Sequence, residues 1–141
     1  MDKVALFTVA TNKYFDYWLH MVKSADKYLF LEDELTFHVF TDVDIKQSFI
    51  ESNLKRVNVK IHKIPNLGWP LDTLYRYKYI LEYGKNLDSD YFVHIDADME
   101  VVPHVSSKIS SLLNNKSMAL VLHPGYWRIG HPKKLFFYCK N

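Results

Sequence analysis

The sequence predicts a single α/β domain, residues 1–141, built around a largely parallel β-sheet. Strand-like apolar runs alternate with segments of helical periodicity, and this order is typical of βαβ units with parallel strands. The first run, residues 4–10, is almost wholly apolar, as expected of a strand covered on both faces. A chain of 141 residues with 48% apolar amino acids is also long enough to bury a core.

The first half of the chain is expected to contain three strands and two helices. Residues 4–10, 35–41 and 57–64 are rich in apolar, β-branched and aromatic residues and are followed by turn-forming residues, which predicts strands. Residues 14–30 carry apolar side chains every three or four positions, which predicts an amphipathic helix. A weaker helix is expected over 45–54.

The second half is expected to begin with a helix that Asp72 or Thr73 caps and that ends near Tyr83. Gly84 would stop this helix. Its apolar positions share one face with a lysine: Leu74, Tyr77, Lys78 and Leu81.

Three further elements are expected after this helix. They are a strand over 91–95, a short helix that begins between Pro103 and Ser106 and ends near Leu113, and a short strand over 119–122. In open parallel sheets, ligands bind beyond the carboxyl ends of the strands. The residues that follow each strand are therefore the candidates for a site.

Two pairs of aspartates follow predicted strands, Asp42 with Asp44 and Asp96 with Asp98. Carboxylates two residues apart can hold a hard cation such as Mn²⁺ or Mg²⁺, which then binds phosphate oxygens. The alternative is that such aspartates only end strands and form turns.

Flanking residues favour the second pair as the metal site. Apolar residues precede Asp96, and Met99 follows Asp98, so we expect both acids to be half-buried. Burying two unpaired carboxylates is costly, and a cation offsets that cost. The first pair is followed by polar residues and is expected to form a solvated turn, with Asp42 also placed to line a nucleotide pocket.

Three other side chains are candidates for ligand contacts, each with an ordinary alternative. Tyr14 follows the first strand and either stacks on a base or packs in the helix core. Trp69 lies in a Gly-Trp-Pro loop and either covers a ligand or anchors the loop. Arg76 either pairs with a diphosphate or lies on the helix surface.

Composition and motifs exclude several other classes. The net charge of +2 is interspersed, without the basic block of nucleic-acid-binding proteins. No glycine-rich phosphate-binding motif is present, and the one cysteine, Cys139, lacks a nucleophile setting. Apart from His123, the histidines are expected to have core or surface roles. The chain has neither a membrane-spanning run nor a signal peptide, so a cytoplasmic location is expected.

Five segments in the same order resemble glycosyltransferase family 6, the family of the histo-blood-group ABO transferases and the α-1,3-galactosyltransferases, which has bacterial and phage members. The two specific segments are Asp-Ala-Asp-Met-Glu at 96–100 and Leu-His-Pro-Gly-Tyr-Trp at 122–127. The other three are Val-Ala-Thr-Asn-Lys-Tyr at 9–14, Val-Phe-Thr-Asp at 39–42, and Gly-Trp-Pro through Arg76.

The resemblance implies a Rossmann-like nucleotide-diphospho-sugar transferase fold of the GT-A type. It implies Mn²⁺, or Mg²⁺, at Asp96 and Asp98, and UDP-galactose or UDP-N-acetylgalactosamine as the donor. Galactose or N-acetylgalactosamine would be transferred with retention to a β-galactoside glycan acceptor, in an α-1,3 linkage. The implied donor contacts are Val9, Ala10, Thr11, Tyr14, Trp69, Thr73, Arg76, Asp96 and Asp98, and the implied acceptor contacts are His123 and Trp127.

Family members continue beyond the segment here at 135–138 into the part that carries the catalytic glutamate and much of the acceptor pocket. The chain is therefore expected to be a truncated, nucleotide-sugar-binding portion, in which no residue is assigned as catalytic. Two alternatives stay open. One is a noncatalytic UDP-sugar-binding or interaction module, and the other is an unrelated parallel α/β protein in which the aspartates form only a turn.

Overall fold

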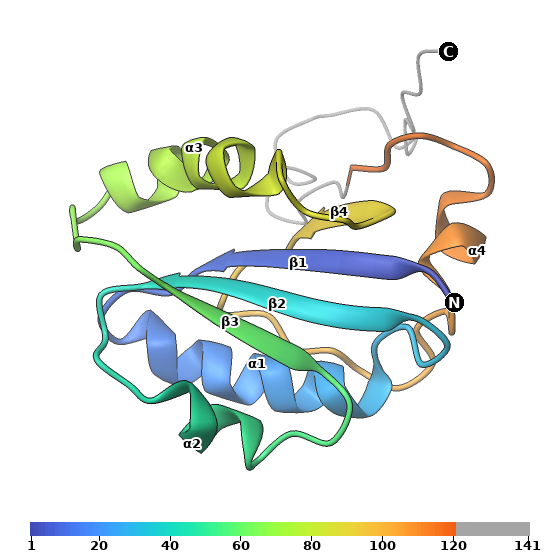
Figure 1. Ribbon diagram of the computed structural model, residues 1–141, viewed down its shortest axis with the longest axis horizontal. Coiled ribbons are helices and arrows are strands. Elements are labelled where there is room, and N and C mark those ends of the chain that lie inside the picture. Colours follow the sequence, from blue (N-terminus) through green and yellow to red (C-terminus); the bar gives the residue numbers. More distant parts are fainter. Residues whose placement is uncertain (121–141) are drawn as a thin grey trace, which may run out of the picture.

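The computed structural model describes residues 1–120, and in these residues four parallel strands form one sheet (Figure 1). The strands are β1 (Lys3–Val9), β2 (Glu34–Thr41), β3 (Asn58–Lys63) and β4 (Tyr91–His94). Their order across the sheet is β3-β2-β1-β4. The α/β class and the parallel sheet are confirmed, and the strand order is compatible with a Rossmann-like fold.

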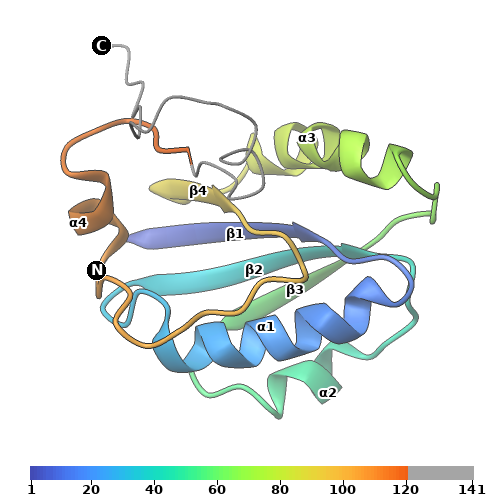
Figure 2. The same cartoon turned by 180° about the vertical axis from the view of Figure 1, so that it is seen from behind.

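Helices cover both faces of this sheet. They are α1 (Tyr14–Tyr28), α2 (Gln47–Glu51), α3 (Leu71–Gly84) and α4 (Ile109–Leu113). Helices α1 and α2 lie on one face, and α3 lies on the other (Figures 1 and 2). The chain adds β2 and then β3 on one side of β1, and it then crosses the opposite face of the sheet to add β4 on the other side of β1. The order in which strands are added therefore reverses between β1 and β4, although all four strands are parallel.

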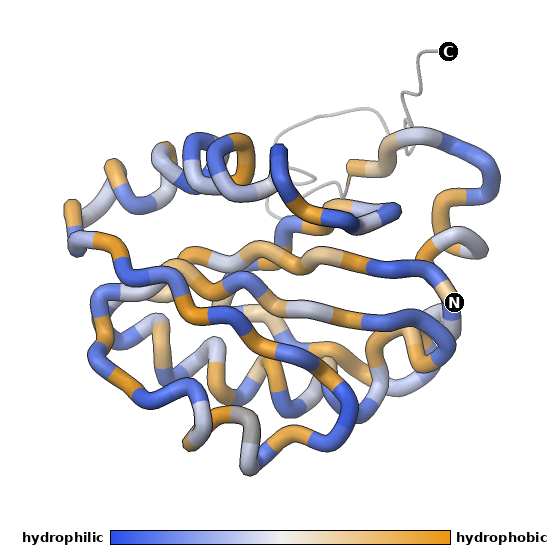
Figure 3. Tube along the Cα trace, viewed as in Figure 1, coloured by the Kyte–Doolittle hydropathy of each residue, from blue (hydrophilic) through white to orange (hydrophobic). Residues whose placement is uncertain are grey.

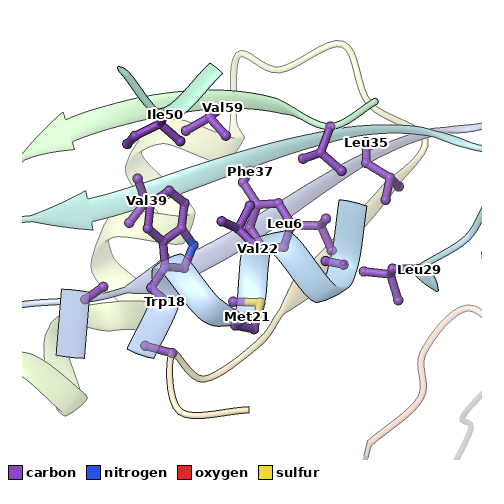
Figure 4. Packing of buried hydrophobic residues seen from close by; sticks show 14 of the residues in the cluster. Leu6, Trp18, Met21, Val22, Leu29, Leu35, Phe37, Val39, Ile50 and Val59 are labelled. Carbon is purple, nitrogen blue, oxygen red and sulfur yellow. The ribbon is translucent and has the colours of Figure 1, made fainter. Parts of the chain in front are cut away.

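The central strand β1 is buried on both faces and divides the core in two. Val4 and Leu6 belong to the cluster that packs under α1, whereas Ala5 and Phe7 belong to the cluster under α3. Figure 3 shows β1 as hydrophobic over most of its length, and Figure 4 shows Trp18 of α1 against sheet residues of the first cluster. This two-sided burial confirms the prediction that residues 4–10 form a strand covered on both faces, although the strand ends one residue earlier, at Val9.

Three helices differ from their predicted bounds for local reasons. Helix α1 ends at Tyr28 because Leu29 is extended and Phe30 has a φ of 38°. Helix α2 begins only after Lys46, whose backbone is extended. Helix α4 begins at Ile109 because Lys108 is also extended, so the predicted start between residues 103 and 106 is wrong.

Helix α3 differs from its prediction in its cap and in its buried face. Pro70 occupies the N-cap position and makes no side-chain cap, so the predicted capping role of Asp72 or Thr73 is wrong. Tyr79 is the buried residue of this helix. The face predicted from apolar spacing is instead exposed in the structure, with Leu74 at 62% and Leu81 at 64% of their free surface.

The predicted strand over 119–122 is not seen where the structure describes it. Residues 119 and 120 belong to no strand, and residues 121 and 122 lie outside the described part of the chain. Within residues 1–120, no helix is both long and apolar enough to cross a membrane.

Candidate functional site

A cleft of about 390 Å³ opens at the carboxyl ends of β1 and β4. Between these two strands the order of strand addition reverses. Open α/β sheets bind their ligands at such a point. The residues that line it come from the end of β1, the start of α1, the loop and first turns of α3, and the end of β4: Val9, Thr11, Tyr14, Trp69, Asp72, Thr73, Arg76, His94, Asp96, Ala97 and Asp98.

The β1 side of the cleft is fixed by Asp72. The buried Thr11 hydroxyl donates a hydrogen bond of 2.8 Å to Asp72 Oδ2. The backbone N–H of Leu67 donates one of 2.9 Å to Asp72 Oδ1. One carboxylate in the first turn of α3 thus ties the end of β1 to the loop that carries Trp69.

We expect this contact to appear as an energetic coupling between Asp72 and Thr11. The variants Asp72→Ala and Thr11→Val each remove one partner, and each should destabilise the fold. In a double-mutant cycle, the double variant should lose about 1 kcal/mol less than the sum of the single losses. Urea unfolding of the four proteins measures this, and additive losses would contradict the expected coupling.

The β4 side of the cleft is built around Asp96. Arg76 Nη1 lies 2.7 Å from Asp96 Oδ1 and 3.4 Å from His94 Nε2. Arg76 Nε also donates a hydrogen bond of 2.7 Å to the Thr73 carbonyl, which holds its side chain along α3. The guanidinium is therefore held between α3 and the end of β4. This contradicts the alternative in which Arg76 only lies on the helix surface.

Burial favours the neutral form of His94 in this arrangement. Burial lowers the pKa of His94 below its usual value, the Asp96 carboxylate opposes this shift, and the charge of Arg76 adds to it. A neutral imidazole can accept a hydrogen bond at Nε2. His94 is therefore suited to accept from Arg76.

The two acids of the Asp-Ala-Asp turn are exposed, so the expectation of half-buried carboxylates is wrong. The Asp96 side chain has 55% of its surface accessible, and Asp98 is also exposed. The turn follows β4, which is the edge strand of the sheet in the described residues. Only Ala97 of this turn joins the core, and Met99 is exposed as well.

Two aromatic side chains line the same cleft. Tyr14 is 44% exposed and contacts Tyr17 edge-on, so it does not pack in the helix core. Trp69 is 88% exposed, so it does not anchor its loop in the core of the described residues. Gly68 precedes it with a φ of 74°, a conformation that glycine adopts without steric cost.

The first acid pair lies outside the cleft lining. Asp42 accepts hydrogen bonds from the Asn12 backbone N–H at 2.7 Å and from Asn66 Nδ2 at 3.1 Å. It therefore connects the turn after β1 to the loop after β3. This agrees with a turn role and not with the alternative that Asp42 lines the pocket.

The cleft contains most of the residues expected to contact a ligand. Ala10 is an exception, because it is buried and its N–H donates to the Phe40 carbonyl at 2.8 Å. His94 and Asp72 were not foreseen as cleft residues. The position of His94, two residues before Asp96 at the end of a strand, was the available signal. The expected acceptor residues His123 and Trp127 lie outside the described residues.

Comparison of the sequence with protein-family models gives no match, and comparison with curated proteins gives no match either.

Proposed function

We propose that this chain binds a UDP-sugar, as the donor-binding portion of a GT-A type glycosyltransferase similar to family 6. The observation that carries the proposal is the cleft between the ends of β1 and β4, which is lined by an acid pair, an arginine and two exposed aromatic residues. Aromatic faces suit a nucleobase, an arginine suits a diphosphate, and paired carboxylates suit the cation that accompanies it.

The acid pair fits a Mn²⁺ or Mg²⁺ ion by its chemistry. Both acids line the cleft, and Asp96 forms an ion pair with Arg76. The Asp96 and Asp98 carboxylates would hold the ion. No three His, Cys, Asp or Glu side chains within residues 1–120 form a ready metal site, so diphosphate oxygens and water would supply the remaining ligands. When bound, the ion neutralises the diphosphate.

The other cleft residues have separate roles in this proposal. Tyr14 stacks on the uracil, and the end of β1 at Val9 and Thr11 bounds the base. Arg76 pairs with the diphosphate, with Thr73 beside it on α3. Trp69 covers the sugar, which is galactose or N-acetylgalactosamine. In the same proposal, the sugar is transferred with retention to a β-galactoside glycan, and His123 and Trp127 contact this acceptor.

One observation favours a second function, a noncatalytic UDP-sugar-binding module. Three carboxylates line the cleft. Asp72 already accepts hydrogen bonds from Thr11 and Leu67, and Asp96 and Asp98 are assigned to the cation. No carboxylate of residues 1–120 is then left in the cleft to act at the anomeric carbon.

Calorimetric titration with UDP tests donor binding. We expect heat that depends on Mn²⁺, and we expect the double variant Asp96→Asn, Asp98→Asn to lose at least about tenfold in affinity, because it loses the charges that hold the ion. The variant Asp42→Asn, Asp44→Asn changes the same residue types outside the cleft and serves as the control. No Mn²⁺-dependent heat from the native chain, or equal binding by both double variants, would exclude the proposed site.

A donor-hydrolysis assay separates the two functions. The chain is incubated with UDP-galactose or UDP-N-acetylgalactosamine and Mn²⁺, and the free sugar is measured. Release of sugar that the Asp96→Asn, Asp98→Asn variant does not give supports an enzyme. Tight binding without any release supports the noncatalytic module.

A further inference from the structure

The Arg76 guanidinium lines the cleft and forms an ion pair with Asp96, one of the two proposed cation ligands. Its Nη1 is 2.7 Å from Asp96 Oδ1, and its Nε is held by the Thr73 carbonyl at 2.7 Å. The side chain is only 19% exposed, whereas that of Asp96 is 55% exposed. The arginine is thus the more fixed partner of a pair that involves one of the two proposed cation ligands.

We infer that Arg76 makes the binding of a divalent cation and the binding of a nucleoside diphosphate depend on each other, because each must compete with the Arg76–Asp96 ion pair when it binds alone. This inference rests on the proposed function and adds a regulatory property to the same site. Arg76 then has two alternating partners, the Asp96 carboxylate and the diphosphate.

The coupling follows from the charges. A dication that binds alone meets a fixed positive charge beside its ligand Asp96 and must weaken the ion pair. A diphosphate that binds alone must draw Arg76 away from Asp96 and lies close to two uncompensated acids. When both bind, Arg76 pairs with the diphosphate and Asp96 with the cation, so the ion pair is separated once for two binding events.

His94 acts as a positioning residue for this exchange. Its Nε2 lies 3.4 Å from Arg76 Nη1 and 3.7 Å from Asp96 Oδ1. As the last residue of β4, it holds the guanidinium at the cleft wall. Arg76 therefore stays within reach of the diphosphate position after it leaves Asp96.

Electron paramagnetic resonance of free Mn²⁺ measures this coupling without any catalytic turnover. The native chain is titrated with Mn²⁺ alone and again with saturating UDP, and the ratio of the two dissociation constants gives the coupling factor. We expect UDP to tighten Mn²⁺ binding about 50-fold. In Arg76→Met and Arg76→Gln, Mn²⁺ alone should bind about tenfold more tightly than to the native chain, and the coupling factor should fall about tenfold.

The matched control is Lys78→Met, which removes one positive charge from the same helix at an exposed position outside the cleft lining. It should leave both dissociation constants within about twofold of native, because solvent and salt screen an exposed charge that makes no contact in the cleft. Circular dichroism and thermal melting confirm that each variant is folded.

The outcomes distinguish the inference from the proposed function. If UDP tightens Mn²⁺ binding equally in native chain and Arg76 variants, and Mn²⁺ alone binds them equally, the inference is wrong while the donor site stands. If the native chain binds Mn²⁺ with the same affinity with and without UDP, both are wrong. If Lys78→Met changes Mn²⁺ affinity and the coupling factor as Arg76→Met does, the change results from net charge alone. This outcome also overturns the inference.

Discussion

Replacing Arg56 with methionine is expected to lower the free energy of unfolding by about 3 to 5 kcal/mol. Arg56 precedes β3, and its guanidinium donates to backbone carbonyls at the end of α1 and in the turn before β2. The acceptors are the carbonyl oxygens of Ala25, Asp26, Leu29, Phe30 and Asp33. The carbonyls of Ala25 and Phe30 also accept from the backbone N–H groups of Leu29 and Asp33. The carbonyl of Leu29 lies just after the end of α1 and has no further helical turn to supply a donor. A methionine at position 56 would remove the side-chain donors from all five carbonyls.

The same junction is held from its other side by Asp26. Its carboxylate accepts from the backbone N–H groups of Lys55, Arg56 and Val57. Burial alone raises the pKa of Asp26, but these three hydrogen bonds and the charge of Arg56 outweigh it, so the pKa of this carboxyl is lowered overall. Arg56→Met therefore removes the positive charge near the Asp26 carboxylate as well as the donors to the backbone carbonyls.

Urea unfolding followed by circular dichroism measures the loss. Lys55→Met is the matched control, because Lys55 is the neighbouring residue, is exposed, and contributes through its backbone N–H. We expect this control to change stability by less than about 0.5 kcal/mol. If Arg56→Met and Lys55→Met are equally stable, then Arg56 does not hold the end of α1.

Acidification from pH 6.5 to 4 is expected to destabilise the chain by about 3 kcal/mol through His38, on the basis of its pKa. His38 lies in β2, is 2% exposed, and its Nδ1 is 3.0 Å from Nε2 of His62 in β3. Burial, His62 and Lys60 lower the pKa of His38 to about 4. Burial and Lys60 also lower the pKa of His62.

The direction in which stability changes with pH depends on whether the folded or the unfolded chain binds the proton. Above pH 6.5, His38 is neutral in both states and does not make stability depend on pH. Between pH 6.5 and 4 the unfolded chain binds a proton that the folded chain does not, so stability falls as pH falls. Below pH 4 both states are protonated and the loss is complete. The rings that surround the pair, Phe7, Phe40 and Tyr83, offer no negative charge to offset it at these pH values.

Denaturant unfolding at several pH values tests this prediction. In His38→Phe the loss of stability between pH 6.5 and 4 should be smaller than in the native chain, because His38 no longer takes up a proton on unfolding. Some loss should remain, because His62 and His94 are still present. His20→Gln changes an exposed histidine of α1 and should leave the native profile in place. Parallel native and His38→Phe profiles would show that His38 does not carry the acid sensitivity.

The aromatic cluster around His38 links this stability to the cleft. Tyr79 of α3 stacks on Phe40, and Tyr83 packs against His62. The same helix carries Asp72, Thr73 and Arg76 at its other end. Helix α3 therefore packs against Phe40 and His62 at one end and forms a wall of the cleft at the other.

The sequence by itself determined the class of the fold and the edge at which the cleft lies. Hydrophobic periodicity depends only on the backbone repeat and on burial, so the continuous apolar run of β1 and the helical spacing of α1 could be read directly. Parallel strands also place their carboxyl ends together, so the order of the strands alone predicts that Thr11, Tyr14 and Asp96 lie at one edge of the sheet.

Only the tertiary structure decided which side chains meet at that edge. Arg76 and Asp96 are 20 residues apart, and Thr11 and Asp72 are 61 apart. No local pattern encodes such distances. The face that α3 buries was also decided there, because Tyr79 finds aromatic partners on the sheet that Leu74 and Leu81 do not reach. Periodicity shows that a helix has an apolar face, whereas the packing of the surrounding elements determines which face is covered.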